Sequence, residues 1–218
     1  MKIKWYGHAA FKVTTDGGVR VIVDPYESGA FGGALSYGKI AEEADIVLTS
    51  HDHEDHNYTK DIKGGYRRLK EEGVYEERGV RIEGIGCYHD AAEGKERGNN
   101  LIFVIEAEGI KLVHMGDLGH MLGPDIRKKI GRVDVLLVPV GGFYTIDPEE
   151  ATRVVADIRP QVTVPMHYRT ARCAFPIEGV EAFTKGKEKV RTLSGSEIEI
   201  RAESLPTEPE IIVLQPAL

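Results

Sequence analysis

One segment limits what this chain can fold into more than any other. Residues 49–57 have the sequence Thr-Ser-His-Asp-His-Glu-Asp-His-Asn, so three histidines and three acidic residues fall within six positions. Burying these groups unpaired in a hydrophobic core would be costly. The segment directly follows a short apolar run at 46–49, which predicts a strand whose end carries these side chains. Because imidazole and carboxylate suit zinc, manganese and iron, the segment predicts a metal-binding loop.

The order of the other elements predicts a mixed α/β (α+β) fold. Short apolar or β-branched runs predict further strands at 3–6, 10–14, 19–24, 74–77, 80–85, 101–107, 110–114, 133–140, 162–165, 198–201 and 211–214. Helices are expected at 124–130, 147–158 and 178–185, the second of them starting with Asp147 as N-cap and Pro148 at its first position. Strands first, then strands alternating with helices, favour two sheets in contact with helices outside, an αββα sandwich. The length of 218 residues suits a single domain, 1–218.

Composition narrows the functional classes. The formal net charge is −7, which opposes nonspecific binding to nucleic acid, and the basic residues at 67–70 are followed at once by Glu71 and Glu72, as on a solvated surface. The amino terminus lacks a signal-peptide core, and no apolar run reaches the length of a membrane helix. Two cysteines far apart, Cys87 and Cys173, are expected to be free thiols. We therefore expect a cytoplasmic protein that binds neither membrane nor nucleic acid.

The spacing His51-x-His53-x-Asp55-His56 resembles the HxHxDH signature of the metallo-β-lactamase superfamily. Three later motifs occur in the order typical of that family: Cys87-Tyr-His89, Met115-Gly-Asp117 and Pro165-Met-His167-Tyr168. The start of the chain, Trp5-Tyr-Gly-His-Ala-Ala-Phe11 followed by Val23-Asp-Pro25, is similar to the UlaG-like branch. That branch includes ascorbate-phosphate lactonase and many uncharacterised hydrolases. The resemblance covers nearly the whole chain.

The resemblance implies an αββα sandwich of the metallo-β-lactamase type with two divalent ions, zinc first and manganese or iron as alternatives. It assigns seven ligands: His51, His53 and His89 to the first ion, Asp55, His56 and His167 to the second, and Asp117 as a bridge between both. Such a pair of ions holds a bridging hydroxide that attacks an ester, lactone or phosphate ester. Asp55 and Asp117 are the catalytic candidates, Asp55 because its carboxylate can help move the proton of the hydroxide.

Other residues have less defined roles. His8 is expected at the pocket edge or hydrogen-bonded to a ligand carboxylate, and Asp24 is expected to orient a ligand imidazole. His120 either faces the pocket as a proton donor or substrate contact, or caps a loop. Arg169 and the nearby Arg172 either bind a phosphate or carboxylate of the substrate or form ion pairs with acidic residues on a surface loop.

The substrate is expected to be a small anionic molecule. One alternative is a phosphodiesterase or nuclease acting on nucleic acid or lipid, and a second is a non-catalytic metal-binding scaffold. The sequence is compatible with a homo-oligomer and does not determine the oligomeric state.

Overall fold

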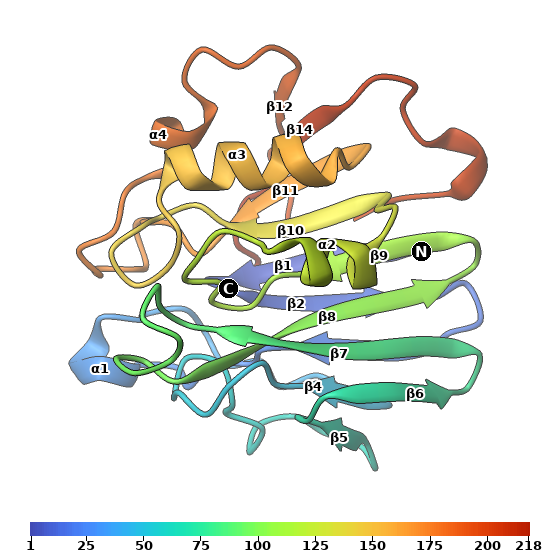
Figure 1. Ribbon diagram of the computed structural model, residues 1–218. Coiled ribbons are helices and arrows are strands. Elements are labelled where there is room, and N and C mark those ends of the chain that lie inside the picture. The colour runs from blue at the N-terminus through green and yellow to red at the C-terminus, as the bar shows by residue number, and fades with distance from the viewer.

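Two β-sheets lie face to face in the computed structural model, which describes all residues, 1–218 (Figure 1). The smaller sheet has six strands in the order β13 (Glu197–Glu199), β1 (Lys2–Gly7), β2 (Ala10–Thr14), β3 (Arg20–Val23), β4 (Ile46–Leu48) and β5 (Arg67–Leu69). The larger sheet has eight strands in the order β12 (Val190–Thr192), β14 (Glu210–Val213), β11 (Val162–Met166), β10 (Val135–Pro139), β9 (Ile110–His114), β8 (Asn99–Ala107), β7 (Val80–Tyr88) and β6 (Gly73–Glu77).

The central strands β3 and β4 of the smaller sheet are buried on both faces, as their apolar sequences require. In β3 and β4, Val21, Val23, Ile46 and Leu48 belong to the main core between the sheets, together with side chains of the larger sheet. Ile22 and its neighbour in β4 point to the opposite face and join a second, smaller core. Side chains alternate between the two faces of a strand, so a continuous apolar run indicates a strand that is covered on both sides.

Helices α2 (Pro124–Ile130), α3 (Pro148–Ile158) and α4 (Val180–Thr184) cover the outer face of the larger sheet (Figure 1). The predicted start of α3 is confirmed: Asp147 accepts a hydrogen bond from the main-chain N–H of Glu150 at 2.7 Å, and the Glu150 side chain accepts one from that of Asp147 at 3.1 Å. The outer face of the smaller sheet is covered instead by loops, the short α1 (Ala30–Gly33) among them, and the 3-10 turn η1 (Ala202–Ser204) precedes β14. The expected two-sheet sandwich is thus confirmed.

The sequence pattern did not predict two edge strands, β5 and β12. Arg67 and Arg68 are exposed to solvent, as predicted for this segment. Their backbone nevertheless pairs in parallel with β4, and only Leu69 of β5 is buried. An edge strand needs one paired neighbour and little buried surface, so its sequence carries a weak signal.

The turns that follow β1, β3, β4, β7, β9 and β11 emerge at one end of the sandwich, on the left in Figure 1. All the histidine and acidic motifs of the sequence lie in these turns. No helix combines the length and hydrophobicity that crossing a bilayer would require.

Candidate metal centre

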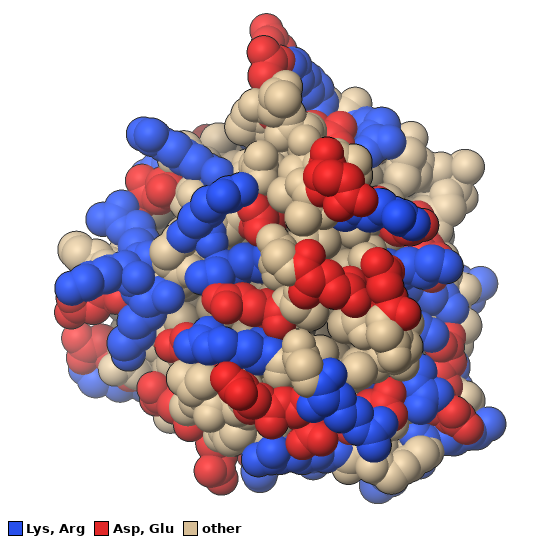
Figure 2. Space-filling model, turned by 90° about the vertical axis from the view of Figure 1, so that its right-hand side faces the viewer, with Lys and Arg blue, Asp and Glu red and all other residues tan.

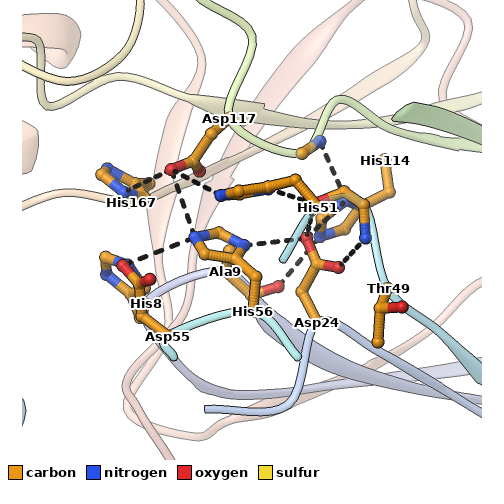
Figure 3. Close-up of polar contacts among 12 residues, drawn as sticks. His8, Ala9, Asp24, Thr49, His51, Asp55, His56, His114, Asp117 and His167 are labelled. Atoms are coloured by element: carbon orange, nitrogen blue, oxygen red, sulfur yellow. Dashed lines mark hydrogen bonds and ion pairs between the residues drawn. The ribbon is translucent and has the colours of Figure 1, made fainter. Parts of the chain in front are cut away.

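The seven predicted ligands come together at this end of the sandwich. Figure 3 shows five of them, His51, Asp55, His56, Asp117 and His167, around the carboxylate of Asp117. Four follow β4, and the others follow β7, β9 and β11. Potential ligand atoms lie within 4.8 Å of one another in three overlapping groups: His51, His53 and His89; His51, His56 and Asp117; and His8, Asp55, His56 and His167. Rigid strand ends hold the groups in place, which metal geometry demands.

Asp117 lies where these groups meet. Its Oδ2 is 3.2 Å from Nε2 of His56, His89 and His167 and 3.9 Å from Nε2 of His51. The carboxylate is almost completely buried. Burial by itself raises the pKa of Asp117, but the adjacent His167 and His56 rings lower that pKa well below its usual range. One carboxylate oxygen therefore faces imidazoles of both predicted ligand sets.

Asp24 orients the histidines that follow β4. Its carboxylate accepts hydrogen bonds from the main-chain N–H and the hydroxyl of Ser50, both at 2.7 Å, and lies 3.0 Å from Nδ1 of His56. Because the Ser50 hydroxyl donates to Asp24, it is free to accept from Nδ1 of His51, 2.9 Å away. Each Nδ1 is then a donor, so Nε2 is the nitrogen of both rings that is available to a metal ion.

His8 supports Asp55. Nε2 of His8 lies 3.0 Å from the Asp55 carboxylate, and the main-chain carbonyl of His8 accepts hydrogen bonds from the indole of Trp5 and the main-chain N–H of His167. Burial and the nearby His167 lower the pKa of His8 to about 4, against the influence of Asp55. His8, Asp24 and His167 have φ angles of 52°, 47° and 50°. Such left-handed backbone costs about 1–3 kcal/mol per residue and is concentrated at functional sites in proteins.

Asn100 at the start of β8 holds the backbone that presents Asp117, and the sequence patterns missed it. Its side chain accepts from the main-chain N–H of Asp117 at 2.9 Å and donates to the carbonyl of Met115 at 2.9 Å. Between them, Gly116 has φ 54°, and a Cβ there would lie 2.3 Å from the Asn100 side-chain oxygen. Two adjacent asparagines directly before a long apolar run, in a chain with only three asparagines, were the signal available.

Comparison with known proteins identifies the family. The beta-lactamase superfamily domain matches residues 2–167. A UPF0173 metal-dependent hydrolase of Thermococcus onnurineus is 30% identical, over 78% of this chain and 85% of the relative. The crystal structure of a proposed zinc-dependent hydrolase of the metallo-β-lactamase superfamily from Thermotoga maritima is 36% identical and covers 98% of this chain and 97% of its own, with a TM-score of 0.81. The chain belongs to the metallo-β-lactamase superfamily. It is a metal-dependent hydrolase. A metallo hydrolase from Ignicoccus hospitalis shares the fold at 22% identity, covering 99% of this chain and 95% of its own, with a TM-score of 0.67.

The donor set of this hydrolase fits divalent metal. Nε2 of His51, Nε2 of His56 and Oδ1 of Asp117 are buried without a hydrogen-bond partner. Burial lowers the pKa of His56, but the carboxylates of Asp117 and Asp55 raise that pKa well above its usual range, so the centre retains a proton between His56 and Asp117, 3.2 Å apart. A divalent cation held by the same atoms would take the place of that proton. Imidazole and carboxylate are ligands that zinc prefers.

His114 and His120 serve the backbone of the hydrolase. His114 donates from Nε2 to the carbonyl of Ala9 at 2.9 Å and accepts from the N–H of Gly116 at 3.0 Å, as expected of a core residue. His120 accepts from the main-chain N–H of Tyr88 at 3.1 Å and donates to the carbonyl of Met121 at 2.9 Å. Both nitrogens of His120 are occupied, which favours the loop-capping reading. The bond to Tyr88 stabilises the turn that carries His89.

Arg169 does not join the centre. It is exposed and lines a cavity of about 400 Å³ with Arg172, and none of the seven predicted ligands lines that cavity. A different cavity, of about 840 Å³, is lined by His51 and His53. Its other charged residues are Asp52, Lys70, Glu71, Glu72 and Arg97. The basic groups beside the centre therefore come from segments that the sequence patterns did not single out.

Proposed function

We propose that this hydrolase uses two divalent ions, zinc in the first place, to cleave an ester, lactone or phosphate ester of a small anionic molecule. His51, His53 and His89 would hold one ion, Asp55, His56 and His167 the other, and Asp117 would contact both. The observation that carries the proposal is the position of Asp117 Oδ2, within 3.9 Å of imidazoles from both sets. Elemental analysis of the zinc-loaded chain should approach two equivalents; a maximum of one would contradict the two-metal proposal.

A bound metal pair supplies an activated water and polarises the bond to be broken, because coordination lowers the pKa of water to about 7. The protein's part is to position and to move protons. Burial raises the pKa of Asp55, but His56 and the hydrogen bond with His8 lower that pKa overall. A carboxylate kept ionised in this way can accept a hydrogen bond from an attacking water and direct its proton toward the leaving group. His8 holds that carboxylate in place.

Arg97 is our candidate for the anion contact. It lines the cavity that contains His51 and His53, and its guanidinium can form two parallel hydrogen bonds with a phosphate or carboxylate. Asp90, directly after His89, fixes the loop that carries it. The Asp90 carboxylate accepts four main-chain hydrogen bonds, from residues 92, 94, 96 and 97, at 2.7–3.1 Å. Arg97 is thus tied to the same turn as a predicted ligand.

A small substrate suits this cavity better than a polymer does. Asp52, Glu71 and Glu72 stand around Arg97 and Lys70, and the chain as a whole carries −7, so an extended polyanion meets repulsion. The two cysteines are buried and free, which supports our proposal of a reducing, cytoplasmic location.

Side-by-side assays of the zinc-loaded chain test the substrate class. The panel contains a phosphorylated lactone, a simple phosphodiester, a neutral ester and single-stranded RNA. We expect turnover of the small anionic lactone or phosphate ester, which would also support the UlaG-like affiliation. Efficient RNA cleavage that weakens steeply with salt, without turnover of the small molecules, would establish the nuclease alternative instead. Metal binding without turnover of any substrate in a broad panel would favour the scaffold.

A further inference from the structure

Four aromatic side chains form a continuous surface beside the metal centre; we call Phe31, Phe143, Tyr144 and Phe175 the aromatic wall. Phe175 contacts Phe31 at a ring-centroid distance of 5.3 Å and Tyr144 at 5.7 Å. Phe143 contacts Tyr144 at 4.8 Å. The rings meet edge to face, the arrangement that aromatic pairs prefer. They come from α1 and from the turns after β10 and β11, at the end of the sandwich that carries the centre (Figure 1).

The aromatic wall connects the centre to solvent. At its inner end, Phe175 packs on the ring of His8 at 5.6 Å, and His8 hydrogen-bonds to Asp55. On its side, the guanidinium of Arg97 lies 5.9 Å from the ring of Tyr144. At its outer end, Phe31 and Phe143 are 49% and 64% exposed. A molecule whose reacting bond lies at the centre can therefore reach both Arg97 and the apolar rings.

Core packing does not account for this exposed aromatic surface. Phe31 has φ 53° and is followed by two glycines with positive φ, so the backbone adopts an uncommon conformation to present this ring. Of the five exposed large apolar residues of the chain, four lie at the metal end: Phe31 in α1, Tyr88 at the end of β7, and Met121 and Phe143 in turns. The fifth, Val74, is on the edge strand β6. Apolar surface concentrated at one functional end marks a binding site.

We propose that the substrate is amphiphilic: an apolar acyl or aromatic group packs against the aromatic wall while the anionic group of the same molecule binds Arg97. The assignment of this ligand as a substrate rests on the proposed function. The wall and Arg97 stand on neighbouring sides of the centre, and together they select a molecule that carries both groups.

Binding of n-alkyl phosphonates, from methyl to octyl, to the zinc-loaded full chain tests the inference by calorimetry, without any need for turnover. Burial of each methylene should increase affinity about two- to fourfold until the wall is covered. Phe31→Ala and Phe143→Ala should each reduce this gain with chain length and leave the affinity for methylphosphonate unchanged. Val74→Ala, an equally exposed apolar residue that makes no ring contact with the wall, is the matched control and should keep the full gain.

Equal affinity along the series, or an unchanged gain in both phenylalanine variants, would overturn the inference. Sedimentation of the same samples identifies the competing occupant: a dimer that dissociates in Phe31→Ala would make the wall a self-association surface and would also overturn it. An ester series separates this result from the proposed function. Chain-length-dependent binding without hydrolysis of any ester would refute the proposed function and keep the ligand site, whereas hydrolysis with flat binding would refute the inference alone.

Discussion

At the metal end of the sandwich, buried imidazole and carboxylate atoms face one another without hydrogen-bond partners, whereas charged groups at the opposite end neutralise each other. Figure 2 shows that opposite end, where acidic and basic side chains alternate over the surface. There Arg78 pairs with Asp45 at 2.6 Å, and Lys111 pairs with Glu106 at 2.8 Å. A cavity of about 820 Å³ lies among these hairpins, lined largely by such charges. The cavity at the metal end measures about 840 Å³, so cavity size does not distinguish the two ends, whereas buried polar atoms without partners do.

The ends also differ in apolar exposure and in where left-handed backbone occurs. At the charged end it occurs at the hairpin residues Arg78 and Glu108, whereas at the metal end it occurs at the buried residues His8, Asp24 and His167, and exposed phenylalanines gather there as well. Strain and exposed apolar surface lower stability, so a protein retains them where binding or catalysis compensates. The charged side chains at the opposite end favour solubility but contribute little to the free energy of unfolding, because exposed ion pairs contribute about 0–1 kcal/mol each.

The largest effect in the comparison of the two ends is expected when the carboxylate of Asp117 is removed. Asp117→Ala should lower kcat/KM about 1,000-fold or more and reduce the zinc content, because several kcal/mol of transition-state stabilisation depend on the metal pair. His120→Ala, which removes only two main-chain hydrogen bonds, should lose less than about tenfold. Kinetics and elemental analysis of both variants provide the measurement. A dead His120 variant beside an active, metal-replete Asp117 variant would refute the assignment of the bridge.

A smaller effect is expected for Asp24, which contacts a predicted metal ligand but is not itself one. Asp24→Asn keeps the size of the side chain but removes the charge that accepts from Ser50 and His56. Loss of such a partner typically weakens metal affinity about 10- to 100-fold. Competition with a zinc chelator measures that affinity. Unchanged affinity in a folded Asp24→Asn protein would show that the histidine orientation does not depend on this carboxylate.

Two arginines at the metal end distinguish the two cavities. Arg97→Ala should raise KM for an anionic substrate about tenfold or more with little change in kcat, since hydrogen bonds to charged groups contribute about 1.5–3 kcal/mol. Arg169→Ala, the matched control in the other cavity, should change KM less than about twofold. Neutral esters should respond to neither variant. The reverse pattern would return the anion contact to Arg169.

The least effect is expected at the charged end. Arg78→Ala breaks the pair with Asp45, yet it should change the free energy of unfolding by no more than about 1 kcal/mol and leave kcat/KM unaltered. Urea denaturation and standard kinetics measure both. A large loss of activity would show that the two ends are coupled and would break the comparison drawn above.

Local sequence patterns predicted much of the secondary structure. The alternation of turn residues with short apolar runs located most strands, and Asp147-Pro148 marked the start of α3 correctly. The edge strands β5 and β12 were missed because main-chain pairing leaves little trace in their side chains. The set of seven metal-site residues came from motif resemblance; the structure brings them together, and metal binding by each of them stays a prediction.

By itself the sequence predicted the chemistry of the centre, because His51, His53 and His56 lie within six positions of one segment and imidazoles in that density are typical of a metal site. Only the tertiary structure decided what surrounds it. Arg169 lies two residues after His167, but its main-chain N–H pairs with Glu178 and the chain carries it into another cavity. Arg97, which lines the cavity of the centre, meets Tyr144 of the aromatic wall from a separate turn. Proximity between distant segments depends on how strand ends converge, and no local pattern encodes that convergence.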